Sequence, residues 1–140
     1  MIRYLLDTNI CIYLIKERDP ALKLKLYEKG IGRCALSAIT LAELSYGVEK
    51  SSKVEQNKLA LGLFLSPFEL LPFSTGAAFI YGNIRRQLEL RGEVIGGYDM
   101  LIAAHALAEG LTLVTNNEAE FTRVEGLYLE NWVSHKKRKE

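Results

Sequence analysis

The stretch "YLLDTNICIYLI", from Tyr4 to Ile15, sets a short polar group inside an otherwise apolar segment. Residues 2–6, which precede that group, are mostly aliphatic or aromatic, and this pattern predicts a buried strand. Thr8 and the residues after it can begin a helix, so the chain is expected to turn at Asp7. A carboxylate is thereby placed where a buried strand gives way to a helix.

The rest of the chain alternates between short apolar segments and longer amphipathic ones. Further strands are predicted over residues 32–36, 68–71 and 111–114, with an edge strand within 126–132. Helices are predicted over residues 20–29, 37–50, 54–65, 75–91 and 99–109. The clearest helix has Ser74 as its cap and ends at Gly92. Strands that alternate with helices of ten or more residues predict an α/β fold, with a mainly parallel sheet between two layers of helices.

The composition predicts one globular domain, because 49% of the 140 residues are hydrophobic and 25% are charged. We expect this domain to span residues 1–134 and a basic tail to occupy residues 135–140. Four of the 18 basic residues lie in the tail sequence "KKRKE", so the body carries a small acidic excess. Contacts with nucleic acid would therefore depend on local patches or on the tail, which is otherwise a solvated terminus.

The cysteines and the N-terminal segment bear on the compartment in which the protein works. Cys11 and Cys34 lie in apolar surroundings and show neither zinc-site spacing nor a disulfide framework. The N-terminal apolar run is interrupted by Asp7 and Asn9, and no segment approaches the roughly 18 apolar residues of a membrane span. We expect a cytoplasmic protein that does not associate with membranes.

Four acidic residues, Asp7, Glu43, Asp99 and Glu120, are the candidates for a functional site. Each has an alternative structural role. Asp7 and Asp99 are acceptable helix caps, and Glu120 is acceptable on the surface. Thr40 and Glu43 have the T-x-x-E spacing of a capping box, in which Glu43 would bond the Thr40 amide, although Ser37 could cap the same helix.

Considered together, these acids point to a metal site. Three of them fall near predicted strand-to-helix junctions, and ligands bind at that edge of a parallel sheet. Neighbouring carboxylates repel one another unless a cation neutralises them, and the segments that carry these acids contain no Lys or Arg before Arg123. Magnesium prefers oxygen ligands and retains waters, one of which could be activated to attack a phosphate ester. The pattern therefore predicts metal-dependent phosphoester hydrolysis.

Three uncharged residues, Asn9, Thr115 and Asn117, could orient these carboxylates without adding negative charge. Turn and cap formation is the alternative role for each of them, and for Asn116. Histidine-based acid and base catalysis is disfavoured, because the chain has only His105 and His135. His135 lies in the tail, and His105 is turned away from Asp99 on the same helix, at the edge of the core or on the surface.

Four blocks of sequence together resemble the PIN-domain ribonucleases, and specifically the VapC toxins of toxin–antitoxin pairs. These blocks are "YLLDTNICIYLIK", "SAITLAELSYGVEKS", "IGGYDMLIAAHALAEGLTLVTNNEAEF" and "VEGLYLENW". The resemblance implies a three-layer α/β/α PIN-like domain whose acidic residues bind Mg²⁺ or Mn²⁺ for endonucleolytic cleavage of RNA. It assigns these acids to Asp7, Glu43 and Asp99. The fourth is assigned to Glu120, with Glu118 and Asn117 remaining open.

The resemblance also implies partners. VapC toxins are usually inhibited by a VapB antitoxin whose C-terminal segment lies across the active site. They commonly form homodimers, and they contact operator DNA only through the antitoxin. Many members of the family cut tRNA, and initiator tRNA is a frequent target of those from enteric bacteria.

We therefore expect a metal-dependent endoribonuclease in which Asp7 and Asp99 hold the metal directly. Glu43 and Glu120 would complete its shell and help to deprotonate the attacking water, leaving a 5′-phosphate. Two other classes remain open. One is a PIN-like binding module without catalysis. The other is a phosphatase of the haloacid dehalogenase type, which needs a second Asp where this chain has Asn9.

Overall fold

A single parallel sheet forms the centre of the molecule in the computed structural model, which describes residues 1–134. Its strands are β1 (Tyr4–Leu6), β2 (Cys34–Ser37), β3 (Glu69–Leu71), β4 (Thr112–Val114) and β5 (Leu129–Glu130). They lie in the order β3-β2-β1-β4-β5, and every neighbouring pair is parallel. The predicted parallel sheet is confirmed, including the edge strand. The predicted basic tail and His135 lie outside the described residues.

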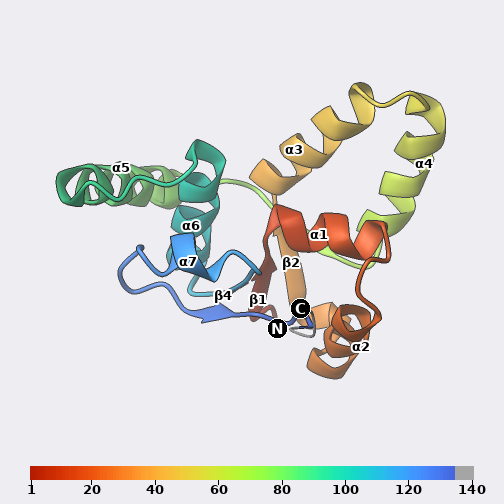
Figure 1. Ribbon diagram of the computed structural model, residues 1–140, viewed down its shortest axis with the longest axis horizontal. Coiled ribbons are helices and arrows are strands. Elements are labelled where there is room, and N and C mark those ends of the chain that lie inside the picture. Colours follow the sequence, from red (N-terminus) through yellow and green to blue (C-terminus); the bar gives the residue numbers. More distant parts are fainter. Residues whose placement is uncertain (135–140) are drawn as a thin grey trace, which may run out of the picture.

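Helices cover both faces of the sheet (Figure 1). They are α1 (Thr8–Ile15), α2 (Pro20–Lys29), α3 (Ala38–Glu49), α4 (Val54–Leu65), α5 (Thr75–Arg91), α6 (Gly97–Glu109) and α7 (Glu118–Phe121), with a short 3₁₀ helix, η1 (Ile31–Arg33). Helices α5 and α6 pack together on one side of the strands, and α1, α2 and α3 lie on the other. Within the described residues, none of the helices has the length and apolar character needed to cross a bilayer.

The core is split into two parts by the sheet. Leu5 points into the part that contains α5, α6 and α7, whereas Tyr4 and Leu6 point into the part that contains α1, α2 and α3. This alternation follows from the two-residue repeat of a strand, and both faces are apolar because helices cover both. The three-layer α/β/α architecture is therefore confirmed. Asp7 is buried, but it belongs to neither apolar cluster.

Local capping signals explain why several predicted helix ends are correct. The Ser74 hydroxyl accepts a hydrogen bond from the Ala77 amide at 3.1 Å and begins α5. Gly92 and Gly110 end α5 and α6 with φ of 68°, a left-handed conformation that glycine adopts without steric cost. Helix ends that carry such signals were predictable from a few adjacent residues.

Several local features differ from the predictions. Strand β1 begins at Tyr4, two residues later than predicted, and β3 and β4 each begin one residue later. The η1 turn occupies the residues before Cys34, so β2 begins two residues later than predicted. Helix α6 begins at Gly97 rather than at Asp99, because Gly96 is its cap. The short helix α7 was not predicted at all.

The path of the chain through the sheet creates one switch point. From β1 the chain adds β2 and β3 on one side, and then crosses over to add β4 and β5 on the other. Strands β1 and β4 are therefore neighbours whose following segments leave in opposite directions. In open parallel sheets a crevice forms at this position, outside the carboxyl ends of the strands. Asp7 follows β1 and Thr115 follows β4, so both lie at this crevice.

Candidate active site

Asp7 lies at the switch point with its carboxylate free of any capping role. It is the N-cap residue of α1, but its side chain makes no capping hydrogen bond. Instead, the Thr115 hydroxyl donates to Asp7 Oδ2 at 2.8 Å, and the Asp7 amide donates to the Val114 carbonyl at 2.9 Å. Asp7 is only 4% exposed, and this burial raises the pKa of its carboxyl although the Thr115 hydrogen bond lowers it. A buried carboxylate at this edge is one that a cation would stabilise.

Glu43 reaches the same edge from α3. The Ser37 hydroxyl accepts from the Ile39 amide at 3.0 Å and caps α3, so Thr40 lies inside the helix. Glu43 Oε1 accepts a hydrogen bond of 2.6 Å from the Thr8 hydroxyl. The capping-box alternative for Thr40 and Glu43 is therefore wrong, because Ser37 already caps the helix and Glu43 bonds a residue of α1 instead.

Asp99 is the third residue of α6 and is half-buried at the mouth of the crevice. Its pKa is raised to about 6, first by burial and then by the negative charges of Asp7, Glu120 and Glu43. Gly96 leaves room for this carboxylate, since a Cβ there would lie 3.4 Å from Asp99 Oδ2. Asp99 is not the helix cap, because Gly96 is. The charges of all three other candidate acids lie close enough to raise the pKa of Asp99.

The fourth acid of the candidate site is Glu120 rather than Glu118, judged by which of them lies close to the other acids. Glu120 Oε1 accepts from the Asn117 side chain at 3.1 Å, and its charge raises the Asp99 pKa. Glu118 instead accepts from Asn131 at 3.2 Å and is exposed. The geometry therefore favours Glu120 as the fourth acid, with Asn117 as the residue that orients it.

This difference between the two glutamates can be tested by matched substitutions. Glu120→Gln removes a charge that acts on Asp99, so we expect RNA cleavage to fall by about ten- to a hundredfold. Glu118→Gln, two residues away on the same short helix, should retain cleavage within about twofold, as surface changes do. Single-turnover rates would measure both, and an inverted pattern would assign the fourth position to Glu118.

Three of the acids, Asp7, Glu43 and Asp99, open onto a cleft of about 420 Å³, and Glu120 is not among the residues that line it. Its lining residues are Asp7, Thr8, Asn9, Ile12, Glu43, Asp99, Asn116 and Asn117. Asn9 lines the cleft, but its amide donates to Asn116 Oδ1 at 3.0 Å rather than to a carboxylate. The Asn117 backbone amide donates to the Thr115 hydroxyl at 2.9 Å, and this hydroxyl in turn holds Asp7. Thr115 and Asn117 therefore orient carboxylates, whereas Asn9 bonds another amide.

The donor groups of this cleft fit a hard divalent cation. They are carboxylate, hydroxyl and amide oxygens, and within residues 1–134 no Lys or Arg forms an ion pair with the four candidate acids. Among the same residues, no three His, Cys, Asp or Glu side chains are close enough to hold a metal by themselves. Magnesium tolerates this spacing, because it usually takes one or two carboxylates and keeps several waters.

The hydroxyl of Thr115 offers a test of how Asp7 is held. Thr115→Val keeps the shape of the side chain but removes the donor to Asp7 Oδ2, so the pKa of Asp7 should rise further. We expect the affinity for Mn²⁺ to fall by about ten- to a hundredfold, as when other residues that orient metal ligands are replaced. Isothermal titration calorimetry would measure this change. Thr115→Ser, which retains the hydroxyl, should bind Mn²⁺ as the parent does.

Thr8 is the site residue that the sequence did not predict. Its hydroxyl bonds Glu43 and also lies 3.0 Å from the Thr40 hydroxyl, which is fully buried. In the sequence, the position of Thr8 between Asp7 and Asn9 could have indicated that it belongs to the site. The pattern was interpreted only as the start of a helix. The hydroxyl therefore joins α1 to α3 directly beside the cleft.

His105 takes no part in the cleft. It is fully buried, with Nδ1 2.8 Å from the Ser37 hydroxyl and its ring edge-on to Phe73. Burial lowers the pKa of the imidazole, which favours its neutral form. The surface location considered for His105 is wrong because α6 is buried over most of its circumference. A fully buried, neutral imidazole beneath α3 cannot exchange protons with a substrate in the cleft.

Comparison with known proteins agrees with this geometry. The PIN domain family model matches residues 4–127. Ribonuclease VapC2 of Rickettsia felis is 50% identical over 131 residues, which cover 92% of this chain and 97% of the relative. The tRNA(fMet)-specific endonuclease VapC of Shigella flexneri is 42% identical, covering 94% and 99% of the two chains.

A solved structure is similar over the same extent. The crystal structure of VapBC2 from Rickettsia felis, bound to a DNA fragment from its promoter, superposes with a TM-score of 0.87. The two sequences are 48% identical, and the match covers 94% of this chain and 99% of the other. The chain therefore belongs to the PIN-domain family and, within it, to the VapC ribonuclease toxins of VapBC toxin–antitoxin systems.

Proposed function

We propose that this VapC ribonuclease is a Mg²⁺-dependent endonuclease that cleaves tRNA and is inhibited by a VapB-type antitoxin, with Mn²⁺ as a possible substitute. The observation that carries the metal dependence is the meeting of Asp7, Glu43 and Asp99 at one cleft, where burial and the charges of the neighbouring acids, Glu120 included, raise the pKa of Asp99 to about 6. A cation among these acids would relieve their mutual repulsion at a pH where Asp99 is ionised.

In this proposal Asp7 and Asp99 are the direct metal ligands, and Glu43 and Glu120 complete the shell. Bound magnesium would supply Lewis acidity toward a water and toward the phosphoryl oxygens. Glu43 is held by the Thr8 hydroxyl at 2.6 Å, so its carboxylate has a fixed direction from which to accept a proton of the attacking water. Attack of water on phosphorus breaks the bond to the 3′-oxygen, which leaves with a proton, and yields a 5′-phosphate and a 3′-hydroxyl.

The choice of tRNA as substrate rests on similarity. The Shigella flexneri relative, 42% identical over almost the whole chain, is a tRNA(fMet)-specific endonuclease. The described body of the protein has no excess of basic residues to select RNA in general, so recognition would depend on local features around the cleft. An enzyme with this substrate would act in the cytoplasm.

The proposed antitoxin partner rests on the solved Rickettsia felis complex, VapBC2 bound to promoter DNA. Large apolar side chains also stay exposed on α4 and α5, at Leu59, Leu63, Phe79 and Leu90. Helices α4 and α5 lie at opposite ends of the molecule (Figure 1), so these side chains form two separate apolar groups, and exposed apolar groups of this kind mark protein contacts. We therefore expect this toxin to form homodimers and to reach operator DNA only through its antitoxin.

The proposal is tested by incubating purified, antitoxin-free protein with total tRNA, in magnesium and in excess EDTA. Discrete fragments should form with magnesium alone and carry 5′-phosphates, as shown by direct adaptor ligation. Fragments that end in cyclic phosphates would overturn the attack by water. Absence of cleavage of any RNA by folded protein would instead indicate a binding module without catalysis.

A further inference from the structure

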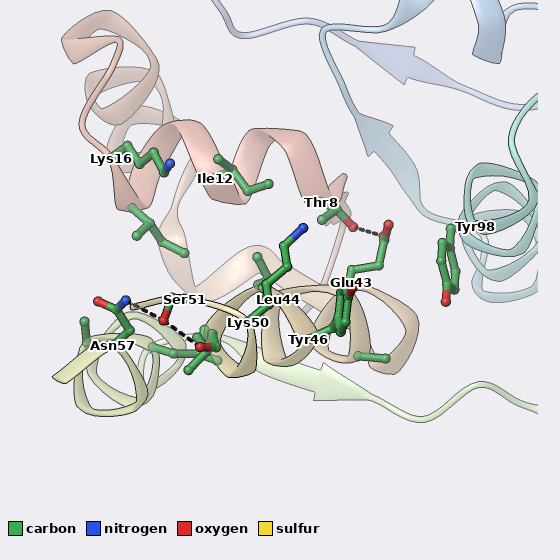
Figure 2. Close-up of a pocket in the computed structure, with 16 residues that line it drawn as sticks. Thr8, Ile12, Lys16, Glu43, Leu44, Tyr46, Lys50, Ser51, Asn57 and Tyr98 are labelled. Atoms are coloured by element: carbon green, nitrogen blue, oxygen red, sulfur yellow. Dashed lines mark hydrogen bonds between the residues drawn. The ribbon is translucent and has the colours of Figure 1, made fainter. Parts of the chain in front are cut away.

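A second hollow adjoins the acidic cleft. Its volume is about 660 Å³, and its lining comes mainly from α1, α3 and α4. Thr8, Ile12 and Glu43 line both this groove and the acidic cleft, so the two hollows share a wall. Figure 2 shows Glu43 at one end of the groove, where it bonds Thr8, and Asn57 and Ser51 at the other. A long substrate that enters the acidic cleft would therefore extend into this groove.

Two tyrosines on the groove wall stand beside Glu43. Tyr98 precedes Asp99 and is 58% exposed, and Tyr46 lies one turn after Glu43 on α3 and is 65% exposed. In Figure 2 the Tyr98 ring stands across from Glu43 and is not covered by the labelled side chains. Within residues 1–134, the Tyr98 side chain makes no hydrogen bond, ring contact or ion pair. The Tyr98 ring is therefore available to contact a ligand in the groove.

Two lysines supply positive charge to the same groove. Lys16 and Lys50 follow the last residues of α1 and α3, and both are exposed. Lys50 Nζ lies 5.1 Å from the centre of the Tyr46 ring. Neither ammonium has a carboxylate within 4 Å among the described residues. The groove, whose other lining residues are largely aliphatic, thus joins two exposed aromatic rings to two cations without carboxylate partners in residues 1–134, a combination that suits bases and phosphates respectively.

We propose that Tyr98 and Tyr46 form a stacking subsite for unpaired nucleobases next to the scissile phosphodiester, and that Lys16 and Lys50 hold the RNA backbone beyond it. This inference rests on the proposed ribonuclease function and specifies its substrate as a single-stranded segment or loop. Bases inside a duplex already stack on one another and leave no face for a tyrosine, whereas bases in loops can be splayed out onto aromatic rings.

The subsite is tested with a short RNA that carries the mapped cleavage site in a loop. Tyr98→Ala should lower kcat/KM by roughly five- to 150-fold, the range for loss of one stacked base. Tyr98→Phe keeps the ring and should stay within about twofold of the parent. Tyr27→Ala is the matched control, since Tyr27 is 59% exposed on α2 and lies outside the groove. Mn²⁺ affinity should be equal in all three variants.

An abasic nucleotide beside the cut makes the test specific to stacking. In the parent, removing the stacked base should lower kcat/KM by a factor similar to that of Tyr98→Ala. In Tyr98→Ala the same abasic substrate should cause little further loss, because both changes remove one interaction. The subsite would be overturned if the abasic substrate lowered kcat/KM by the same factor in Tyr98→Ala as in the parent. It would also be overturned if the parent cleaved the abasic substrate at the normal rate.

Direct binding separates this inference from the proposed function. Fluorescence anisotropy in EDTA measures the affinity of the same RNA for parent and Tyr98→Ala without cleavage. If the parent cleaves no RNA but Tyr98→Ala still weakens binding, the nuclease proposal fails and the subsite stands. If Tyr98→Ala binds and cleaves RNA normally but loses affinity for an antitoxin peptide, the groove belongs to a protein partner and the subsite is overturned.

Discussion

Asp99→Asn is expected to lower cleavage of tRNA by at least about a thousandfold, which corresponds to about 4 kcal/mol of lost transition-state stabilisation. The substitution keeps the size of the side chain but removes the charge at the position where burial and three other acids converge. Asp7→Asn should have a similar effect, since Asp7 is the most buried of the four acids. Single-turnover cleavage of an end-labelled tRNA at saturating magnesium would measure both losses.

A control must show that Asp99→Asn and Asp7→Asn lose activity without losing the fold. Glu125→Gln removes an exposed acid outside the cleft and should cleave tRNA within about twofold of the parent. Circular dichroism should give the same spectrum for all variants. Expression in cells offers a second measurement, in which Asp7→Asn and Asp99→Asn should be far less toxic than the parent. Parental cleavage or toxicity by either variant would remove that residue from the site.

The elements of this fold were predictable wherever the signal is local. Ser74 and Gly92 bound α5 because a hydroxyl caps one end and a left-handed glycine ends the other, and both signals lie in the adjacent sequence. The start of α6 gave no such signal, because its cap is Gly96, which has no side chain to form a capping bond. Asp99 therefore looked like a cap in the sequence although it lies inside the helix.

The candidate site was harder to predict because its defining contacts join distant parts of the chain. The T-x-x-E spacing of Thr40 and Glu43 also fits a capping box. Ser37 caps the helix instead, but the partner of Glu43, Thr8, lies 35 residues away and could not be predicted from local sequence. The hydrogen bond from Asn9 to Asn116 spans 107 residues. Sequence pattern could therefore indicate which residue types gather at the sheet edge, but not which of them bond one another.

Metal-free protein is expected to become more stable, not less, when Asp99 is replaced by Asn. The pKa of Asp99 is raised from 3.8 to about 6, so the folded state holds a proton more strongly than the unfolded state. Stability from this group is therefore present below about pH 4 and is lost as the pH rises through about 6. Above that pH the ionised carboxylate opposes folding, by on the order of 1 to 2 kcal/mol.

Thermal unfolding in EDTA measures this effect. At about pH 7.5, Asp99→Asn should raise the Tm by roughly 4 to 8 °C. The gain should shrink toward zero as the pH falls below about 4, because the parent carboxyl then carries its proton. Taking the difference between variant and parent removes the contribution of the other carboxylates, including Asp7, whose pKa burial also raises. A Tm difference that does not change with pH would show that ionised Asp99 is not the source of the destabilisation.

Magnesium should reverse the order of stability. At a concentration of about a hundred times its Kd, a ligand that binds only the folded state adds about 2.7 kcal/mol, or roughly 10 °C in Tm for a chain of this size. The parent should gain this amount at about pH 7.5 and much less at about pH 5, where Asp99 is largely protonated and cannot act as a ligand. Asp99→Asn should gain little at either pH. A parent that gains nothing from magnesium or manganese would contradict the metal site, since the repulsion among its acids would then have no cation to relieve it.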